Sequence, residues 1–206
     1  MIATGKLPVT YPARPTNGGP IDRAVPKVGD WMYEPKYNGW RALVYVPSGR
    51  MWNRYGGELT IKDKFDTALA QLKETDLLWA DCEALERRHD KGRGSLIVFD
   101  APSTMPTVKP AGTKYPYVFR KVVLEESGLP NVGDIKAPSK AGAYICPVIP
   151  EGAVEGYWQD MKEFNEREGC EFFEGLVAKK VDSKYPIQLR SPNEKFGYWI
   201  KHRFKA

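Results

Sequence analysis

The sequence is poor in the residues that build disulfide frameworks and metal centres. Its 206 residues include three cysteines and two histidines. Cys82, Cys146 and Cys170 lie far apart, so neither a disulfide framework nor a zinc-binding C-x-x-C pair is indicated. The histidines, His89 and His202, are too few for a histidine-based metal site. This cysteine usage favours a reducing compartment.

Long apolar runs are also missing. No stretch is long and apolar enough to span a membrane, and the N-terminus lacks the hydrophobic core of a signal peptide. No internal repeat is present either. We therefore expect a soluble, cytoplasmic protein that is a monomer and does not contact a membrane.

What the sequence does contain is a moderate excess of positive charge on an ordinary globular composition. Hydrophobic residues make up 42%, which is enough for a core, and charged residues make up 28%. The formal charge of +5 and the isoelectric point near 9.0 favour an anionic partner, of which nucleic acid is the usual one. The length predicts one domain, with room for a small appendage.

Sequence patterns predict more strands than helices, without the regular alternation of a parallel sheet. Residues 1–29 are rich in Pro, Gly and Thr and are expected as an extended arm, and 30–206 as the folded domain. The predicted strands cover 31–34, 41–46, 51–54, 77–83, 95–100, 144–149, 171–181 and 197–204. The predicted helices cover 62–75, 119–127 and 156–168. The charged loop 86–93 is expected to lie in solvent. This order predicts an α+β fold with largely antiparallel sheets.

The segment from Glu34 to Arg41, E-P-K-Y-N-G-W-R, places a lysine between two predicted strands. Lys36 becomes a nucleophile when neighbouring cations or desolvation favour its neutral amine. Gly39 would allow a tight turn close to a ligand, and Arg41 would present a guanidinium to a phosphate or carboxylate. A hairpin turn with a surface lysine and arginine is the simpler interpretation of this segment alone.

Further charged and aromatic residues recur on predicted strands and strand ends. Asp81 and Glu83 alternate along one strand, so both side chains point to the same face, where a carboxylate can bond ribose hydroxyls or hold Mg²⁺. Each member also has a plainer interpretation, as a solvated charge, a core aromatic or part of a basic surface. The set comprises Arg54, Asp81, Glu83, Phe99, Glu174, Lys179, Lys201 and Arg203.

Taken in order, these segments resemble the motifs of covalent nucleotidyltransferases, the superfamily of ATP-dependent DNA ligases, RNA ligases and mRNA capping enzymes. The segments are K-Y-N-G-W-R, N-R-Y-G-G-E-L, A-D-C-E-A, I-V-F-D, E-G-L-V-A-K and W-I-K-H-R, and the resemblance extends from Glu34 to Arg203. Three positions depart from the family pattern. Asn38 replaces an aspartate, Cys82 replaces a glycine, and Arg203 replaces the second lysine of Lys-x-Lys.

The resemblance implies a ligase adenylation-domain fold related to ATP-grasp proteins, in which two largely antiparallel sheets with flanking helices form a nucleotide cleft. It implies that Lys36 attacks the α-phosphate of ATP, forms a lysyl-AMP phosphoramidate and releases pyrophosphate. Glu83 and Glu174 would hold Mg²⁺. The resemblance also implies that Glu34 contacts the nucleotide, that Glu83 contacts ribose and that Phe99 stacks on adenine. Arg41 and Arg54 would contact the sugar, the phosphates or a nucleic-acid 5′-phosphate. The catalytic Lys179 and Lys201, with Arg203, would contact the α-phosphate.

Within the superfamily, the segment E-G-L-V-A-K resembles ligases more than capping enzymes. The stretch N-R-Y-G-G-E-L-T and Trp199 resemble DNA ligases more than RNA ligases. The expected activity is therefore ATP-dependent sealing of nicked duplex DNA, as used in DNA replication and repair. The alternatives are joining of RNA ends, a nucleotide-binding module that has lost turnover, and a basic nucleic-acid-binding domain whose motif matches are coincidental.

The chain stops a few residues after W-I-K-H-R. Members of the superfamily commonly carry a β-barrel (OB) domain after this segment. Because the sequence ends so soon after it, this chain is expected to lack a C-terminal OB domain. A minimal ligase, a fragment, and a ligase whose clamp comes from another protein are all compatible with this ending.

Overall fold

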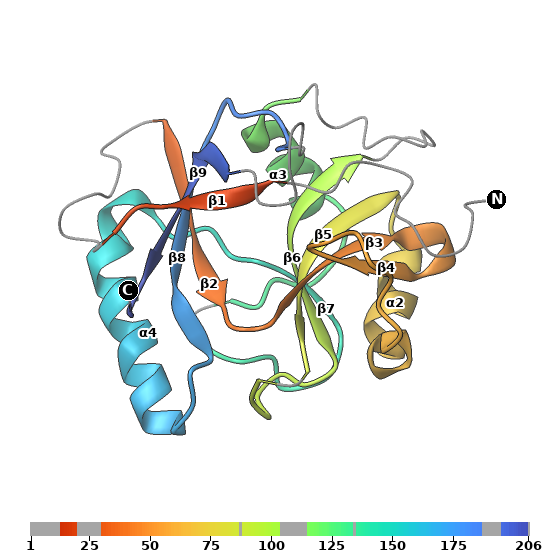
Figure 1. Cartoon of the computed structure of the whole chain (residues 1–206), viewed down its shortest axis with the longest axis horizontal. Helices are drawn as coiled ribbons and strands as arrows, with labels where there is room; N and C mark the ends of the chain where they lie inside the picture. The colour runs from red at the N-terminus through yellow and green to blue at the C-terminus, as the bar shows by residue number, and fades with distance from the viewer. Residues whose placement is uncertain are drawn as a thin grey trace.

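The computed structural model describes residues 13–19, 30–86, 88–103, 115–133, 135–186 and 195–205. These residues form two sheets that lie side by side, with helices against their outer faces (Figure 1). The arrangement is the predicted α+β fold. No helix in the described ranges is long and apolar enough to cross a membrane.

The first sheet has four strands in the order β1-β9-β8-β2. Its strands are β1 Arg14–Asn17, β9 Lys195–Arg203, β8 Phe173–Lys180 and β2 Trp31–Tyr37. The pairs β2–β8 and β8–β9 are antiparallel, whereas β1 pairs with β9 in parallel. The described part of the predicted arm thus contributes a strand to this sheet, while 1–12 and 20–29 lie outside the described residues.

The second sheet has five strands in the order β4-β3-β5-β6-β7. Its strands are β4 Arg50–Asn53, β3 Trp40–Tyr45, β5 Trp79–Leu85, β6 Ser95–Ser103 and β7 Ala143–Ile145. Only the β6–β7 pair is parallel among the pairs of this sheet that the structure describes. The expectation of two largely antiparallel sheets is therefore confirmed, with one parallel pair in each.

Three α-helices flank the sheets in the described part of the chain. They are α2 Asp66–Lys73, α3 Tyr117–Glu125 and α4 Val154–Glu168, and short 3₁₀ turns η1 Val46–Ser48, η2 Lys62–Phe65 and η4 Glu151–Ala153 accompany them. The helix predicted over 119–127 is thus shifted two residues towards the N-terminus. Gly169, with φ 63°, ends α4 in the left-handed conformation that glycine adopts without strain.

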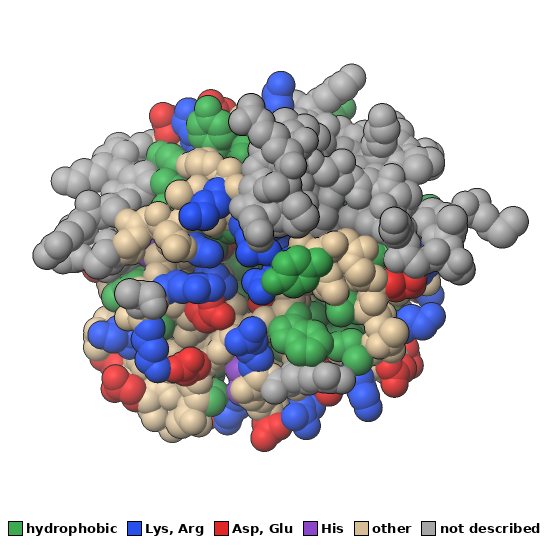
Figure 2. Space-filling model, in the orientation of Figure 1, with side chains coloured by type: hydrophobic (Ala, Val, Ile, Leu, Met, Phe, Trp, Pro, Cys, Tyr) green, Lys and Arg blue, Asp and Glu red, His purple; other side chains and the backbone are tan. Residues whose placement is uncertain are grey.

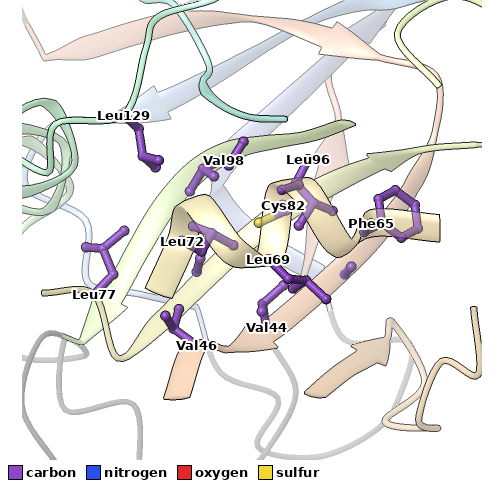
Figure 3. Packing of buried hydrophobic residues seen from close by; sticks show 14 of the residues in the cluster. Val44, Val46, Phe65, Leu69, Leu72, Leu77, Cys82, Leu96, Val98 and Leu129 are labelled. Atoms are coloured by element: carbon purple, nitrogen blue, oxygen red, sulfur yellow. The ribbon is translucent and has the colours of Figure 1, made fainter. Parts of the chain in front are cut away.

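Two large hydrophobic clusters hold the helices and sheets together. One lies between α2 and the second sheet, where Leu69 and Leu72 of the helix pack on Val44, Cys82 and Val98 of the strands (Figure 3). The other lies against α4 and the first sheet, and is rich in phenylalanine rings from Phe164, Phe172 and Phe173. It also includes Leu85 and Ile97 of the second sheet, so this cluster joins the two sheets.

The segment around Lys36 differs from its prediction in two respects. Strand β2 continues through Pro35 to Tyr37, because β2 is an edge strand of its sheet and an edge strand accommodates proline. Strands β2 and β3 then belong to different sheets, so Asn38 and Gly39 form a crossing between sheets and not a hairpin turn. Lys36 consequently sits on a paired strand opposite Gly175 of β8.

Several other boundaries also differ, most clearly at β7 and β6. Strand β7 ends at Ile145, four residues before the predicted end, and Ile149 makes only an isolated bridge to Tyr33. Strand β6 runs on to Ser103, into a segment predicted as loop, while 104–114 lie outside the described residues.

Candidate active site

A cavity of about 390 Å³ lies between the two sheets. Basic side chains gather across the middle of the molecular face shown in Figure 2, with acidic side chains beside them. All ten residues that the sequence assigned to the site lie on the wall of this one cavity: Glu34, Lys36, Arg41, Arg54, Glu83, Phe99, Glu174, Lys179, Lys201 and Arg203. The segments that carry them are far apart in the sequence and come from both sheets.

Lys36 reaches the cavity from β2 and forms an ion pair with Glu174 of β8. Lys36 Nζ lies 2.7 Å from Glu174 Oε2, and Arg203 Nη2 lies 3.1 Å from the same oxygen. Both side chains of the Lys36–Glu174 pair keep access to solvent, at 17% and 20% exposure. Burial alone would raise the pKa of Glu174, but Lys36, Arg203 and Arg88 outweigh it and hold the pKa below its ordinary value.

Glu83 lies on the opposite wall, on β5, and fixes the crossing between the sheets. Its Oε1 accepts a hydrogen bond of 2.9 Å from the backbone N–H of Gly39. A methyl group at Gly39 would lie only 2.5 Å from the carbonyl oxygen of Ala84, so the glycine serves this close approach to β5. Burial, and then the charge of Glu174, raise the pKa of Glu83, and Lys36 opposes the shift.

Glu83 and Glu174 are the carboxylates that could hold Mg²⁺. No cluster of three or more metal-ligating side chains occurs in the described ranges. A magnesium ion bound through one or two carboxylates together with substrate phosphates does not need such a cluster. Both side chains line the cavity, and their charges influence each other. The donor set therefore fits a magnesium ion that arrives with a nucleotide.

Lys201 on β9 lies on the cavity wall close to other cations. Burial, the neighbouring Arg203 and then Lys36 lower the pKa of Lys201 to about 8. An anion entering the cavity would favour its ammonium form, because opposite charge stabilises the protonated amine.

Lys179 occupies a different environment from the other cavity lysines. Its Nζ lies 2.6 Å from Glu34 Oε2 and donates to the carbonyl oxygen of Phe99, and both partners of the ion pair are only 2% exposed. Three rings lie around it, with Nζ 4.7 Å from the centroid of Phe99, 4.6 Å from that of Tyr117 and 4.4 Å from that of Trp199. Two residues that the resemblance assigns to the nucleotide are therefore partners of each other in the wall.

Glu34 is the centre of a buried polar network that includes helix α3. Lys121 Nζ lies 2.9 Å from Glu34 Oε1, and the Tyr117 hydroxyl donates to the same oxygen at 2.5 Å. Burial would raise the pKa of Glu34, but Lys121 and Lys179 lower it below its ordinary value. The network thus holds an ionised carboxylate on β2, two residues before Lys36.

Arg41 is held in place by an equally buried partner. Its Nε and Nη2 donate to the two oxygens of Asp81, at 3.0 and 2.6 Å, and Tyr185 donates to the same carboxylate. Asp81 and Glu83 project from one face of β5, as their spacing predicts, but only Glu83 lines the cavity. The guanidinium of Arg41 lies 5.5 Å from the Phe99 centroid.

The three departures from the family pattern lie in different places. Asn38 donates to the carbonyl oxygen of Glu171 at 2.8 Å. Cys82 is fully buried in the core beneath α2, on the opposite face of β5 from Glu83 (Figure 3). Arg203 is the second partner of Glu174. The cysteine therefore does not take part in the site.

The sequence did not identify two further arginines of the cavity wall. Arg14 comes from β1, and Arg88 comes from the charged loop that was predicted to be in solvent. Arg88 is exposed but faces the cavity, and His89 beside it hydrogen-bonds the carbonyl oxygen of Asn38 at 3.0 Å. Neither arginine belongs to a local pattern, so only the tertiary fold brings them to the site.

This arrangement of strands is the fold of ligase adenylation domains. Comparison with family models finds no match, and comparison with curated proteins finds none either. Solved structures, however, match most of the chain.

The ligase domain of LigD from M. tuberculosis matches with a TM-score of 0.61 and 20% identity, over 94% of this chain and 59% of that one. Mycobacterial DNA ligase D complexed with ATP and MES matches with a TM-score of 0.60 and 20% identity, over 95% and 60%. Chlorella virus DNA ligase–adenylate matches with a TM-score of 0.54 and 17% identity, over 95% and 69%. The chain thus spans about three-fifths of the first two structures.

Proposed function

We propose that the protein is an ATP-dependent polynucleotide ligase that works through a covalent lysyl-AMP on Lys36. The observation that carries the proposal is the surroundings of Lys36. It is a solvent-accessible lysine on a strand that pairs with β8, it faces a cavity of nucleotide size, and Glu174, Arg203 and Lys201 surround it. Positioning and charge neutralisation are what phosphoryl-type transfer requires of a protein.

In the first step Lys36 Nζ forms a bond to the α-phosphorus of ATP. The bond from this phosphorus to the oxygen that bridges to the β-phosphate breaks, and pyrophosphate leaves with the electron pair. The ammonium must first lose a proton, and Glu174 Oε2 is an acceptor in direct contact at 2.7 Å. Lys201 and Arg203 lie beside this pair and offset the charge of the phosphates.

Magnesium would neutralise phosphate charge and is assigned to Glu83 and Glu174. Phe99 offers a ring on the cavity wall for the base, and Arg41, fixed by Asp81, borders the same ring. These roles follow from the match of each residue to the motif that carries it.

In the second and third steps AMP passes to a 5′-phosphate, and a 3′-hydroxyl then attacks and releases AMP. We propose nicked duplex DNA as the substrate. The DNA ligases among the solved structures, the stretch after Arg54 and the tryptophan before Lys201 support this choice. The formal charge of +5 suits a phosphate backbone.

Incubation with α-labelled ATP and Mg²⁺ tests the first step. We expect acid-labile label on the wild-type chain, none on Lys36→Ala or Lys36→Arg, and full label on Lys162→Ala, which changes an exposed lysine of α4. Label on Lys36→Ala would assign the nucleophile to another residue. Bound but non-covalent nucleotide on the wild type would identify a binding module without turnover.

A second assay tests the substrate. Sealing of pre-adenylated nicked DNA, nicked RNA–DNA hybrids and single-stranded RNA ends is compared across a salt series. We expect nicked DNA to be sealed fastest. If the protein neutralises roughly four phosphates, the logarithm of its DNA-binding constant should fall against the logarithm of the salt concentration with a slope of about −3 to −4. Faster joining of single-stranded RNA ends would favour an RNA ligase.

A further inference from the structure

Arg14 is a cation of the cavity wall whose hydrogen-bonding capacity is largely unused. Its Nε and Nη2 atoms are buried and have no hydrogen-bond partner in the part of the chain that the structure describes. It forms no ion pair with a carboxylate of the described residues. Buried N–H groups without an acceptor are unfavourable, so their retention at a cavity wall calls for an acceptor that comes from outside the chain.

The other well-enclosed guanidinium groups do have carboxylate partners. Arg41 pairs with Asp81 at 2.6 Å, and Arg120 pairs with Asp100 at 2.7 Å. Arg14 therefore differs from both in its pairing.

The backbone around Arg14 is fixed on both sides. The carbonyl oxygen of Ala13 accepts a hydrogen bond of 3.1 Å from Arg41. Farther along β1, Asn17 pairs with Lys201 of β9, and Gly18 N–H donates to the Lys201 carbonyl at 3.0 Å. Strand β1 thus places Arg14 on the same sheet as Lys201. The charge of Arg14 contributes to the lowered pKa of that lysine, after the larger effects of burial, Arg203 and Lys36.

Arg14 also shares an aromatic surface with Arg54. The guanidinium carbons of Arg14 and Arg54 lie 5.3 and 4.9 Å from the ring centroid of Tyr55. Tyr55 is 62% exposed, so the pair stands where the cavity opens to solvent. Two guanidinium groups held on one ring, with Lys201 on the same wall, form a region that attracts anions.

We propose that Arg14 binds a phosphate group of the substrate, through the Nε and Nη2 donors that have no partner among the described residues. A planar guanidinium that presents two adjacent donors suits a phosphate oxyanion. The phosphate comes either from the polyphosphate of the nucleotide or from the 5′ end of the polynucleotide. Only this choice of source rests on the proposed ligase function.

Equilibrium binding of two probes tests the proposal without any turnover. The probes are inorganic tripolyphosphate, followed by calorimetry, and a nicked DNA duplex with either a 5′-phosphate or a 5′-hydroxyl at the nick, followed by fluorescence anisotropy. We expect Arg14→Met to weaken one phosphate probe roughly 10- to 100-fold, as loss of a charge-assisted hydrogen bond should. Arg14→Lys should lie in between, and Arg167→Met, an exposed arginine of α4, should bind like wild type.

Thermal unfolding separates a ligand-binding role from a structural one. Because Arg14 has few partners, Arg14→Met without ligand should unfold within about 4 °C of wild type, the scale of one cation–π contact. The same variant should lose the rise in unfolding temperature that the bound phosphate probe gives the wild type. If Arg14 were structural, Arg14→Met would unfold at a clearly lower temperature without ligand and would keep the rise in unfolding temperature on binding the phosphate probe.

Loss of tripolyphosphate binding assigns Arg14 to the nucleotide, and loss of preference for the 5′-phosphate nick assigns it to the polynucleotide. Unchanged binding of both probes by Arg14→Met overturns the proposal. Arg14-dependent tripolyphosphate binding without any lysyl-AMP would refute the ligase function and leave the phosphate site standing. Normal formation of lysyl-AMP, with binding of neither probe dependent on Arg14, would refute the phosphate site and leave the ligase function standing.

Discussion

Two lysines on neighbouring strands, Lys36 of β2 and Lys179 of β8, each form an ion pair with a glutamate, and the two pairs differ in their surroundings. Lys179 and Glu34 are each 2% exposed and are enclosed by rings and further hydrogen bonds. Lys36 and Glu174 are about ten times more accessible and share their wall with other cations. The distances, 2.6 and 2.7 Å, are nearly the same.

The difference shows that the environment of an ion pair, more than its length, determines what it can do. A buried pair is strongly destabilising to break, because one charge is left without a partner in a poorly solvated site. A partly exposed pair contributes little to stability and can exchange partners when a ligand enters. We therefore regard Glu34–Lys179 as the support of the site and Lys36–Glu174 as its reactive part.

Breaking the buried pair should have the largest effect on stability. Glu34→Gln removes the carboxylate from Lys121 and Lys179 and leaves two buried ammonium groups without their counter-charge. We expect the free energy of unfolding to fall by about 3–5 kcal/mol, measured by urea denaturation at pH 7. Glu166→Gln, at an exposed position of α4, is the matched control and should change little. A loss under about 1 kcal/mol would mean that the pair is not structural.

Acid titration of stability extends this test. Since the folded-state pKa of Glu34 lies below its ordinary value, ionised Glu34 stabilises the fold above that ordinary value. The contribution disappears as the pH falls through the lowered pKa. Glu34→Gln should therefore lose less stability than wild type on acidification below the ordinary glutamate pKa, and parallel curves for the two proteins would contradict this.

Changing the exposed pair should affect catalysis and leave stability nearly intact. Glu174→Gln removes a partner of Lys36 and Arg203, which both keep access to solvent. We expect the rate of lysyl-AMP formation to fall on the order of 100-fold, as loss of a magnesium-holding carboxylate would produce. Unfolding should shift by less than about 1 kcal/mol. A variant that is destabilised as strongly as Glu34→Gln would remove the contrast between the pairs.

The third prediction concerns pH and the reactive side of the comparison. Because the pKa of Lys201 is about 8 and a bound anion favours its ammonium, binding of tripolyphosphate should take up a proton near and above pH 8. Affinity should then fall on the order of tenfold between pH 7 and 9.5, which corresponds to a pKa difference of about one unit. In Lys201→Arg the side chain stays charged over this whole pH range, so any pH dependence that remains comes from titration of tripolyphosphate itself. Equal pH dependence in the two proteins would contradict the role of Lys201.

The smallest effect is expected at Cys82, which lies next to Glu83 in the sequence but faces the core. Burial raises the pKa of the Cys82 thiol well above its ordinary value, so the thiol should resist alkylation. Cys82→Ala should lower the free energy of unfolding by about 1 kcal/mol through lost packing and leave lysyl-AMP formation unchanged. A large change in adenylation, measured with labelled ATP, would show that the core face of β5 influences the cavity.

The sequence by itself indicated every described strand except β1, the α+β class and the identity of most charged residues around the cavity. Strand alternation was sufficient to place Asp81 and Glu83 on one face, because the side-chain period of a strand is local. The glycine that ends α4 was equally readable, since helix termination depends on a few neighbouring residues.

Only the tertiary structure decided which of these charges are used up within the protein. Glu34 and Lys179 are separated by almost the whole domain in sequence, and nothing local indicates that they neutralise each other. The same holds for Asp81 with Arg41, and for Arg14, which reaches the cavity because β1 pairs with β9. Charge and exposure depend on what long-range packing brings within a few ångströms, and a sequence pattern records only the residue types.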